Sequence, residues 1–155
     1  MNILIFSIQD KAYGIDITLV REVICLVKVV PVPEAAPFVE GIISMRGKVI
    51  PLISLRKKMG LEYQGNSKST RIIVAQISSH TIGFIADEVI EVVHLDPASV
   101  TLPDELLKEA QYLTGISKVK GRLVLLMDIE KLLSQADHAG IQNVNDRVEV
   151  RKKVC

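Results

Sequence analysis

The feature that most constrains the fold of this chain is an internal repeat. Residues 71–93 align with residues 2–24 without a gap, at a shift of 69 positions. Residues 115–133 align with residues 41–59 in the same order, at a shift of 74 positions. The five-residue difference falls between the two blocks, in an irregular segment where an insertion costs little free energy. The chain is therefore expected to contain two copies of one structural unit.

The strongest support for a duplication comes from paired glycines and paired charges, because short Val/Ile-rich segments match easily by chance. In the first block Gly14 matches Gly83, and Glu22 matches Glu91. In the second block the matched pairs are Gly41 with Gly115, Arg46 with Lys120, Gly47 with Gly121 and Lys48 with Arg122. Units of this size are too thin to bury separate cores. We therefore expect a single domain over residues 1–134, with pseudo-repeat subdomains at about 2–60 and 71–134 that are free to exchange strands.

Each repeat has the same predicted local structure. A strand (3–8 or 72–78) is followed by a turn (9–11 or 79–81) and by a second strand that runs through the paired glycine. After a looser, proline-containing segment comes a hairpin whose tip is a cation followed by glycine, a residue that reaches positive φ without steric cost. A short helix then begins at a good N-cap residue. These N-caps are Ser54, before a helix closed by Gly60, and Asp128, before a slightly longer helix over residues 129–136.

Composition limits the classes of function. The chain has 155 residues, of which 48% are apolar, with no Trp, so the core must be built mainly from Val, Ile and Leu. Lys and Arg number 19 against 18 Asp and Glu, and no basic stripe or aromatic platform predicts nucleic-acid binding. No segment is apolar over the ~20 residues of a membrane span, and the N-terminus does not resemble a signal peptide. Two unpaired cysteines, Cys25 and Cys155, favour a cytoplasmic protein.

A search for catalytic chemistry finds no convergent group of residues. The three histidines, at positions 80, 94 and 138, are scattered and lack the spacing of a zinc site. Cys25 lies in an apolar stretch, where a thiol behaves as a small hydrophobe. Asp87 and Glu88 are adjacent carboxylates that would point to opposite faces of a strand, so we interpret them as solvated or strand-end residues. We expect no enzyme activity, no metal and no cofactor.

Three segments resemble the CheW family of chemotaxis coupling proteins. Residues 39–61, VEGIISMRGKVIPLISLRKKMGL, are similar to the family's block of Gly, an apolar pair, Asn-Leu-Arg-Gly, a Pro-containing strand and a final Leu-Arg. Residues 13–23 resemble the family's second strand and following turn, and residues 112–133 its closing hairpin and helix. The resemblance covers about residues 2–134, with Ser44 and Met45 where the family usually has Asn and Leu.

The resemblance implies a mainly β fold, with two intertwined five-stranded SH3-like β-barrel subdomains and short helices. It also implies a non-enzymatic adaptor that couples the cytoplasmic tips of chemoreceptors (methyl-accepting chemotaxis proteins) to the regulatory domain of the histidine kinase CheA. Subdomain ends would pair with like subdomains of the kinase, and a groove between the barrels would take the receptor's helical hairpin. Such recognition uses apolar residues for affinity and a few charges for register.

The resemblance also implies a receptor-binding site at five positions. Arg46 would be its central charge, with Val20, Glu22 and Gly41 beside it and Ile82 lining the same groove. We expect Glu22 and Arg46 to form an ion pair across the barrel, which would orient the planar guanidinium group. For Val20 and Ile82, ordinary core packing remains an equal alternative. For Gly41 the alternative is a backbone position that needs conformational freedom.

The sequence leaves other functions open. The first alternative is a CheW-like coupling protein of a pilus, gliding or other chemosensory-type pathway; the second is a generic peptide-binding β-barrel. The regulatory domain of a kinase is disfavoured, because the chain begins at its first strand with Met1. Residues 135–155 are polar, and we expect a flexible tail unless Val148 and Val150 dock as an added strand.

Overall fold

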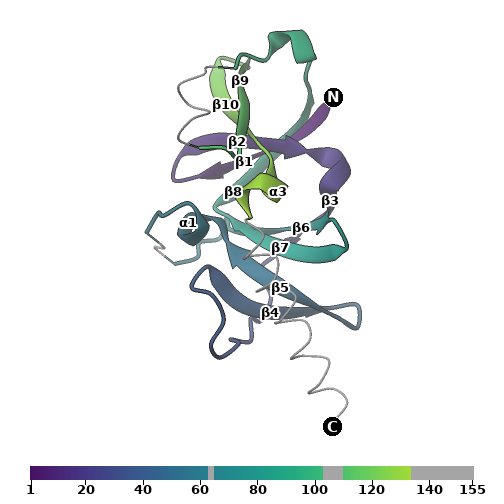
Figure 1. The fold of residues 1–155 in the computed structure, drawn as a ribbon, viewed down its shortest axis with the longest axis vertical. Coiled ribbons are helices and arrows are strands. Elements are labelled where there is room, and N and C mark those ends of the chain that lie inside the picture. Colours follow the sequence, from purple (N-terminus) through teal and green to yellow (C-terminus); the bar gives the residue numbers. More distant parts are fainter. Residues whose placement is uncertain (63–64, 103–109, 134–155) are drawn as a thin grey trace.

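A computed structural model of the protein describes residues 1–62, 65–102 and 110–133. The described residues form ten strands in two five-stranded sheets, with short helical turns between them (Figure 1). This confirms the mainly β fold expected from the sequence. The predicted tail at 135–155 and the end of the predicted second helix lie outside the described residues.

The two sheets have the same strand order when equivalent strands of the two repeats are compared. Sheet 1 has the order β8-β1-β2-β10-β9, and its strands are β1 Asn2–Ile8, β2 Lys11–Asp16, β8 Glu88–His94, β9 Leu113–Val119 and β10 Arg122–Met127. Sheet 2 has the order β3-β6-β7-β5-β4, and its strands are β3 Val20–Cys25, β4 Val39–Met45, β5 Lys48–Ser54, β6 Arg71–Ile77 and β7 His80–Ala86.

Each sheet takes the first two strands of one repeat and the last three strands of the other. The chain therefore crosses between the sheets twice. It crosses from sheet 1 to sheet 2 through the 3-10 turn η1 (Ile17–Leu19), and back at Asp87, between β7 and β8. A second 3-10 turn, η2 (Pro97–Ser99), follows β8. Neither repeat supplies a complete sheet by itself.

The paired glycines of the repeat lie where the two repeats meet within each sheet. Gly14 on β2 is opposite Leu126 on the parallel strand β10, and Gly83 on β7 is opposite Leu52 on the parallel strand β5. A Cβ atom on Gly14 would lie 3.2 Å from the Leu126 side chain, and one on Gly83 would lie 3.1 Å from the Leu52 side chain. Glycine thus allows the equivalent leucines to cross the neighbouring strand closely.

The hairpin tips have the turn chemistry that the sequence predicts. Arg46 and Gly47 adopt φ of 52° and 76°, and Lys120 and Gly121 adopt 51° and 79°. Two consecutive residues with positive φ make the type I′ turn that matches strand twist. The turn predicted at residues 79–81 is wrong by one position: Ser78 adopts φ of 53°, and β7 already begins at His80.

Both predicted helices begin at the predicted N-caps. The Ser54 side chain accepts a hydrogen bond from the Lys57 amide at the start of α1 (Leu55–Lys58), and that helix is followed by Gly60 at φ of 76°. The Asp128 side chain accepts from two amides of α3 (Ile129–Leu132). The second helix is not longer than the first, because Leu133 returns to an extended backbone with ψ of 120°.

Each sheet buries apolar side chains on both faces. The inner faces pack on each other in a shared core that includes Phe6, Tyr13, Ile73 and Phe84. The outer faces of sheets 1 and 2 hold two further clusters, around Ile3 and Ile43 respectively. The segments that follow the edge strands β3 and β8 cross to the opposite edges of their sheets, where Val30 pairs with Ile42 and Thr101 with Ile116. The outer clusters are covered in this way.

Candidate functional site

The structure contains the ion pair that the sequence analysis predicts between Arg46 and Glu22. Arg46 Nη1 lies 2.8 Å from Glu22 Oε2, and the two side chains are 76% and 25% exposed. Glu22 belongs to β3, at one edge of sheet 2, whereas Arg46 lies at the tip of the hairpin that joins β5 to β4, the strand at the other edge. The pair therefore spans the outer face of a strongly curved sheet.

Beneath this ion pair lies a pocket of about 240 Å³. Its lining consists of Arg21, Glu22, Met45, Arg46, Lys48, Ile50, Val74, Gln76 and Thr81. Its base is polar where the Thr81 hydroxyl donates to Gln76 Oε1 at 2.9 Å. Three cations and one carboxylate give the lining a net positive charge, which favours a partner with exposed carboxylates.

The second repeat builds the same arrangement on sheet 1. Lys120 Nζ lies 2.7 Å from Glu91 Oε1, and the two side chains are 74% and 34% exposed. A pocket of about 180 Å³ lies beside this pair, lined by Ile5, Ile90, Glu91, Val119, Lys120, Arg122 and Val124. Every one of these residues is the repeat equivalent of a residue that lines the first pocket. The duplication has therefore preserved an ion pair and a concave surface as well as a strand order.

Val20 and Ile82 lie on the other face of sheet 2 from the Arg46 pair. Both are paired with Ala75, across β3–β6 and β6–β7 respectively, and Ala75 belongs to the shared core. Ile82 is 0% exposed and offers no surface, while Val20 is half-buried against the core. The family resemblance implied that both residues line one groove with Arg46, with core packing as an equal alternative. The structure places Ile82 in the core and Val20 against it, on the face away from Arg46.

A β-bulge explains why Val20 and Glu22 face opposite ways although they are two positions apart. The register of β3 against β6 shifts between them, so that Val20 pairs with Ala75 and Glu22 pairs with Val74. Neighbouring partners on β6 point to opposite faces, and directly paired residues share a face. A bulge inserts one unpaired residue, here Arg21, and so redirects the side chains after it.

Gly41 has a structural requirement for glycine. Its φ is 152°, and a Cβ atom there would lie 2.3 Å from the Val30 carbonyl oxygen. Val30 and Ile42 exchange backbone hydrogen bonds of 2.9 and 2.8 Å across this contact. Glycine therefore allows the segment after β3 to cross β4, and the residue supports the fold of the Arg46 pocket without lining it.

The edge strands β3 and β8 expose valines that the sequence analysis did not single out. Val23 pairs with Ile73 and Val92 with Leu4, so both face the inner side of their sheets, yet they are 37% and 53% exposed. The half-buried Val20 and Val89 lie on the same inner side. We call Val20, Val23, Val89 and Val92 the inner-face valines. These valines are exposed because β3 and β8 are edge strands. The sequence does not show which strands lie at the edges, so their exposure could not be predicted from it.

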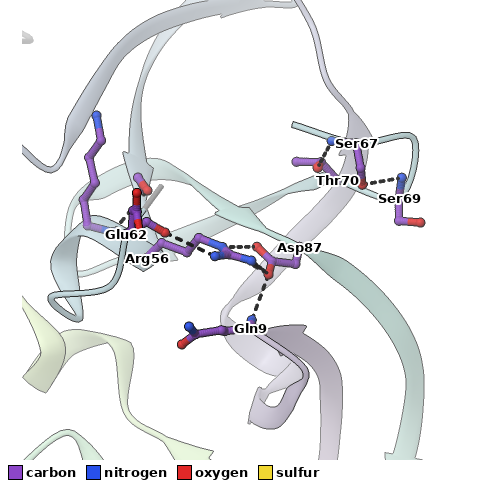
Figure 2. A network of polar contacts seen from close by, with 9 residues as sticks. Gln9, Arg56, Glu62, Ser67, Ser69, Thr70 and Asp87 are labelled. Carbon is purple, nitrogen blue, oxygen red and sulfur yellow. Dashed lines mark hydrogen bonds and ion pairs between the residues drawn. The ribbon is translucent and has the colours of Figure 1, made fainter. Parts of the chain in front are cut away.

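A second polar site, missed by sequence reasoning, surrounds Asp87 (Figure 2). Its carboxylate accepts from Arg56 Nε at 2.8 Å and from the Gln9 amide at 2.8 Å, and it also bonds Arg56 Nη2. Burial alone would raise the pKa of the Asp87 carboxyl, but the Arg56 hydrogen bonds and charge and the Gln9 amide hold it below its ordinary value. Asp87 is a strand-end residue, as one of the two predicted alternatives has it, but its carboxylate is bonded within the protein and is not simply solvated.

Two further observations concern the described part of the chain. Among those residues, no three His, Cys, Asp or Glu side chains are grouped so that they could hold a metal ion. Within the same residues, the structure contains no helix long and apolar enough to cross a membrane.

Comparisons with known proteins agree on one family. A family model described as a CheW-like domain matches residues 2–137. The chain is similar to the chemotaxis protein CheW of Thermotoga maritima, with 32% identity over 86% of this chain and 88% of that protein. It is 34% identical to the chemotaxis protein CheW of Helicobacter pylori, over 84% of this chain and 79% of that protein. A crystal structure of the scaffolding protein TtCheW from Thermoanaerobacter tengcongensis superposes with a TM-score of 0.78 and 34% identity, over 88% of this chain and 89% of that one.

Proposed function

The chain belongs to the CheW-like domain family and is a chemotaxis coupling adaptor, and we propose that it joins the cytoplasmic tip of chemoreceptors to the regulatory domain of the histidine kinase CheA. It acts by binding, in the cytoplasm where both partner surfaces lie, and it transforms no substrate and needs no cofactor. The observation that carries the proposal is the Arg46–Glu22 ion pair above a cationic pocket, at the hairpin that bears the family's Arg-Gly motif.

The receptor-binding surface in this proposal is the edge of β3. On its inner side Val20 and Val23 are partly exposed, and on its outer side Glu22 holds Arg46 over the pocket. A helical hairpin laid along this edge would cover the valines, and its carboxylates would meet the cations of the pocket lining. Apolar burial would supply most of the affinity, and the charges would set register and orientation. Gly41 and Ile82 have structural roles in this proposal: Gly41 allows the segment after β3 to cross β4, and the buried Ile82 packs in the core next to β6, the neighbour of β3.

The kinase-binding surface in this proposal is a subdomain end other than the Arg46 tip, which belongs to the receptor-binding surface. The repeat gives the chain two equivalent hairpin tips, one on each sheet. A partner with the same duplicated fold could then contact one end of this chain with its own equivalent end. Residues at such an end can be changed without touching the inner-face valines, so receptor and kinase binding should be separable by mutation.

The test is to measure the binding of Arg46→Glu to a receptor cytoplasmic fragment and to the CheA regulatory domain. We expect receptor binding to weaken about tenfold or more, because the substitution repels Glu22 and reverses the central charge, while the fold is retained. Lys120→Glu is the matched control at the equivalent tip, and its receptor binding should stay within about twofold.

Unchanged receptor binding by Arg46→Glu would refute the site. If that variant loses the kinase domain and keeps the receptor fragment, the Arg46 pocket is a kinase-binding site instead. Equal losses of receptor binding in Arg46→Glu and Lys120→Glu would mean that the two tips are not functionally distinct.

A further inference from the structure

Asp87 occupies the crossover at which the chain leaves sheet 2 for sheet 1. It follows the last residue of β7 and precedes the first residue of β8. Its own amide donates to the Ser7 carbonyl oxygen on β1 at 3.1 Å, which attaches the crossover to sheet 1. Its carboxylate accepts from Gln9 in the β1–β2 turn, also on sheet 1.

Arg56 attaches the same carboxylate to sheet 2. It lies on α1, which directly follows β5, and its side chain is 15% exposed, against 28% for Asp87. Arg56 Nε and Nη2 both bond the Asp87 carboxylate, and Nη1 donates to the Glu62 carbonyl oxygen at 3.1 Å. Figure 2 shows the guanidinium between the Glu62 backbone and Asp87, with the Gln9 amide reaching the same carboxylate from below. A planar guanidinium held at three nitrogens has little freedom to change orientation.

The crossover in the opposite direction has no equivalent contact among the described residues. The repeat equivalent of Arg56 is Glu130, and that of Asp87 is Thr18. Asp16, beside Thr18, uses its carboxylate locally, where Oδ1 accepts from the Thr18 amide at 3.0 Å and from the Thr18 hydroxyl at 2.9 Å. The Arg56–Asp87 contact, which we call the crossover clasp, is therefore not needed to build the repeated fold, since the other crossover forms without one.

The crossover clasp lies at the root of the edge strand β8. Val89, an inner-face valine, follows Asp87 by two positions, and Val92 by five. The orientation of β8 at its start determines where these two side chains lie relative to sheet 2. Because sheet 2 carries Val20 and Val23 on its own edge strand, the clasp connects the two sheets that bear the four inner-face valines.

We propose that Arg56 and Asp87 are positioning residues for receptor binding: the crossover clasp holds the start of β8 against α1, so that the inner-face valines of both sheets present one surface to the receptor helix. This inference rests on the proposed receptor-binding function and extends its surface from β3 to β8. Neither clasp residue touches the receptor in this arrangement. Their effect on affinity comes from preorganisation of the surface.

The test compares wild-type protein with Asp87→Asn, which has nearly the same shape but removes the negative charge. We expect Asp87→Asn to bind a receptor cytoplasmic fragment about tenfold more weakly, and to bind the CheA regulatory domain within about twofold of wild type. Amide resonances of β8 should shift along the whole strand in a ¹⁵N-labelled sample. Arg56→Lys, which keeps the charge but loses the planar fork, should show an intermediate loss.

Lys57→Gln is the matched control. Lys57 lies on the same helix and forms an ion pair with Glu40, at 2.5 Å, that does not involve the crossover. Its receptor binding and its β8 resonances should match those of wild type. If Asp87→Asn does not fold, Arg56→Lys carries the same comparison.

The outcomes separate this inference from the proposed function. If Asp87→Asn, or Arg56→Lys in its place, binds the receptor fragment like wild type, the positioning role is refuted, whatever happens to stability. If receptor and kinase binding fall equally in the clasp variants, the clasp serves the fold as a whole and the inference is again refuted. If wild-type protein does not bind the receptor fragment, the proposed function fails, while unshifted β8 resonances in Asp87→Asn would refute the clasp independently.

Discussion

The two hairpin tips are the most informative pair of regions in this molecule. Arg46 with Glu22 on sheet 2 and Lys120 with Glu91 on sheet 1 are equivalent in sequence, in turn geometry and in ion pairing. They differ in the cation, because arginine presents a planar fork and lysine a compact point charge. The fork can hold a carboxylate of its own protein and still offer N–H donors to a partner. The same backbone can thus present two recognition surfaces of different specificity.

The two crossovers differ more than the tips do. One carries the Arg56–Asp87 clasp between the sheets, and the other uses Asp16 only for a local turn. The repeated strands and hairpins are under the same packing constraints in both copies. The two crossovers are not, so their polar contacts are free to differ. Over the residues that the structure describes, the comparison between the copies shows that the Arg56–Asp87 contact is specific to one crossover. Variants that change one copy at a time test the differences between the copies.

The largest expected loss of unfolding free energy is that of a substitution at Gly41, and its equivalent Gly115 is the comparison. A Cβ atom on Gly41 would meet the Val30 backbone oxygen at 2.3 Å in a positive-φ conformation, whereas one on Gly115 would meet the Val100 side chain at 2.4 Å. Gly41→Ala should cost about 3 kcal/mol of unfolding free energy. Gly115→Ala should cost about 1 kcal/mol, because a side chain can move. Urea denaturation measures both, and equal losses would contradict the difference between the copies.

The second effect concerns acid stability. The folded pKa of Asp87 lies below its ordinary value of 3.8, so its contribution is present above about pH 4 and is lost as pH falls through the folded pKa. Asp87→Asn should cost about 1–2 kcal/mol at pH 7, discounted for partial exposure. The difference from wild type should shrink below pH 4. Thermal unfolding between pH 2 and 7 measures this, and a constant difference would show that the carboxylate charge is not involved.

The third prediction concerns the receptor affinity of variants in which the tip cations are exchanged. Arg46→Lys should weaken receptor binding by roughly threefold to tenfold, because the fork is lost and the charge is kept. Lys120→Arg at the equivalent tip should leave receptor binding within about twofold. Calorimetric titration with one receptor fragment compares them. A greater loss in Lys120→Arg than in Arg46→Lys would reverse the assignment of the two tips.

The smallest effect is expected from the ion pairs as contributors to stability. Glu22→Gln and Glu91→Gln should each change the unfolding free energy by about 0.5 kcal/mol or less, since both partner cations are largely exposed. Loss of these small differences in high salt would agree with screening of exposed charges. A loss above 2 kcal/mol in either variant would show that the pair is part of the fold.

Much of the local structure could be predicted from the sequence. The repeat predicted equivalent strands, the tip glycines predicted positive φ at two hairpin turns, and Ser54 and Asp128 predicted the starts of both helices. The Arg46–Glu22 ion pair was also predicted, whereas the equivalent Lys120–Glu91 pair was found only in the structure. The turns and caps depend on residues that are near in sequence, and the equivalent strands on a symmetry that the sequence itself displays. The Arg46–Glu22 pair joins distant residues and was predicted only with the help of the family resemblance.

The rest was decided by tertiary structure. Strand exchange between the repeats, the bulge that separates Val20 from Glu22, and the close approach of Val30 to Gly41 arise from partners far apart in the chain. The same holds for the contact of Arg56 with Asp87, which are 31 positions apart. A side chain's neighbours along the chain determine its turn or cap, but its face and its charge partner depend on which strand packs beside it. Which strands pack together is determined by burial of the whole core, and no local sequence pattern predicts it.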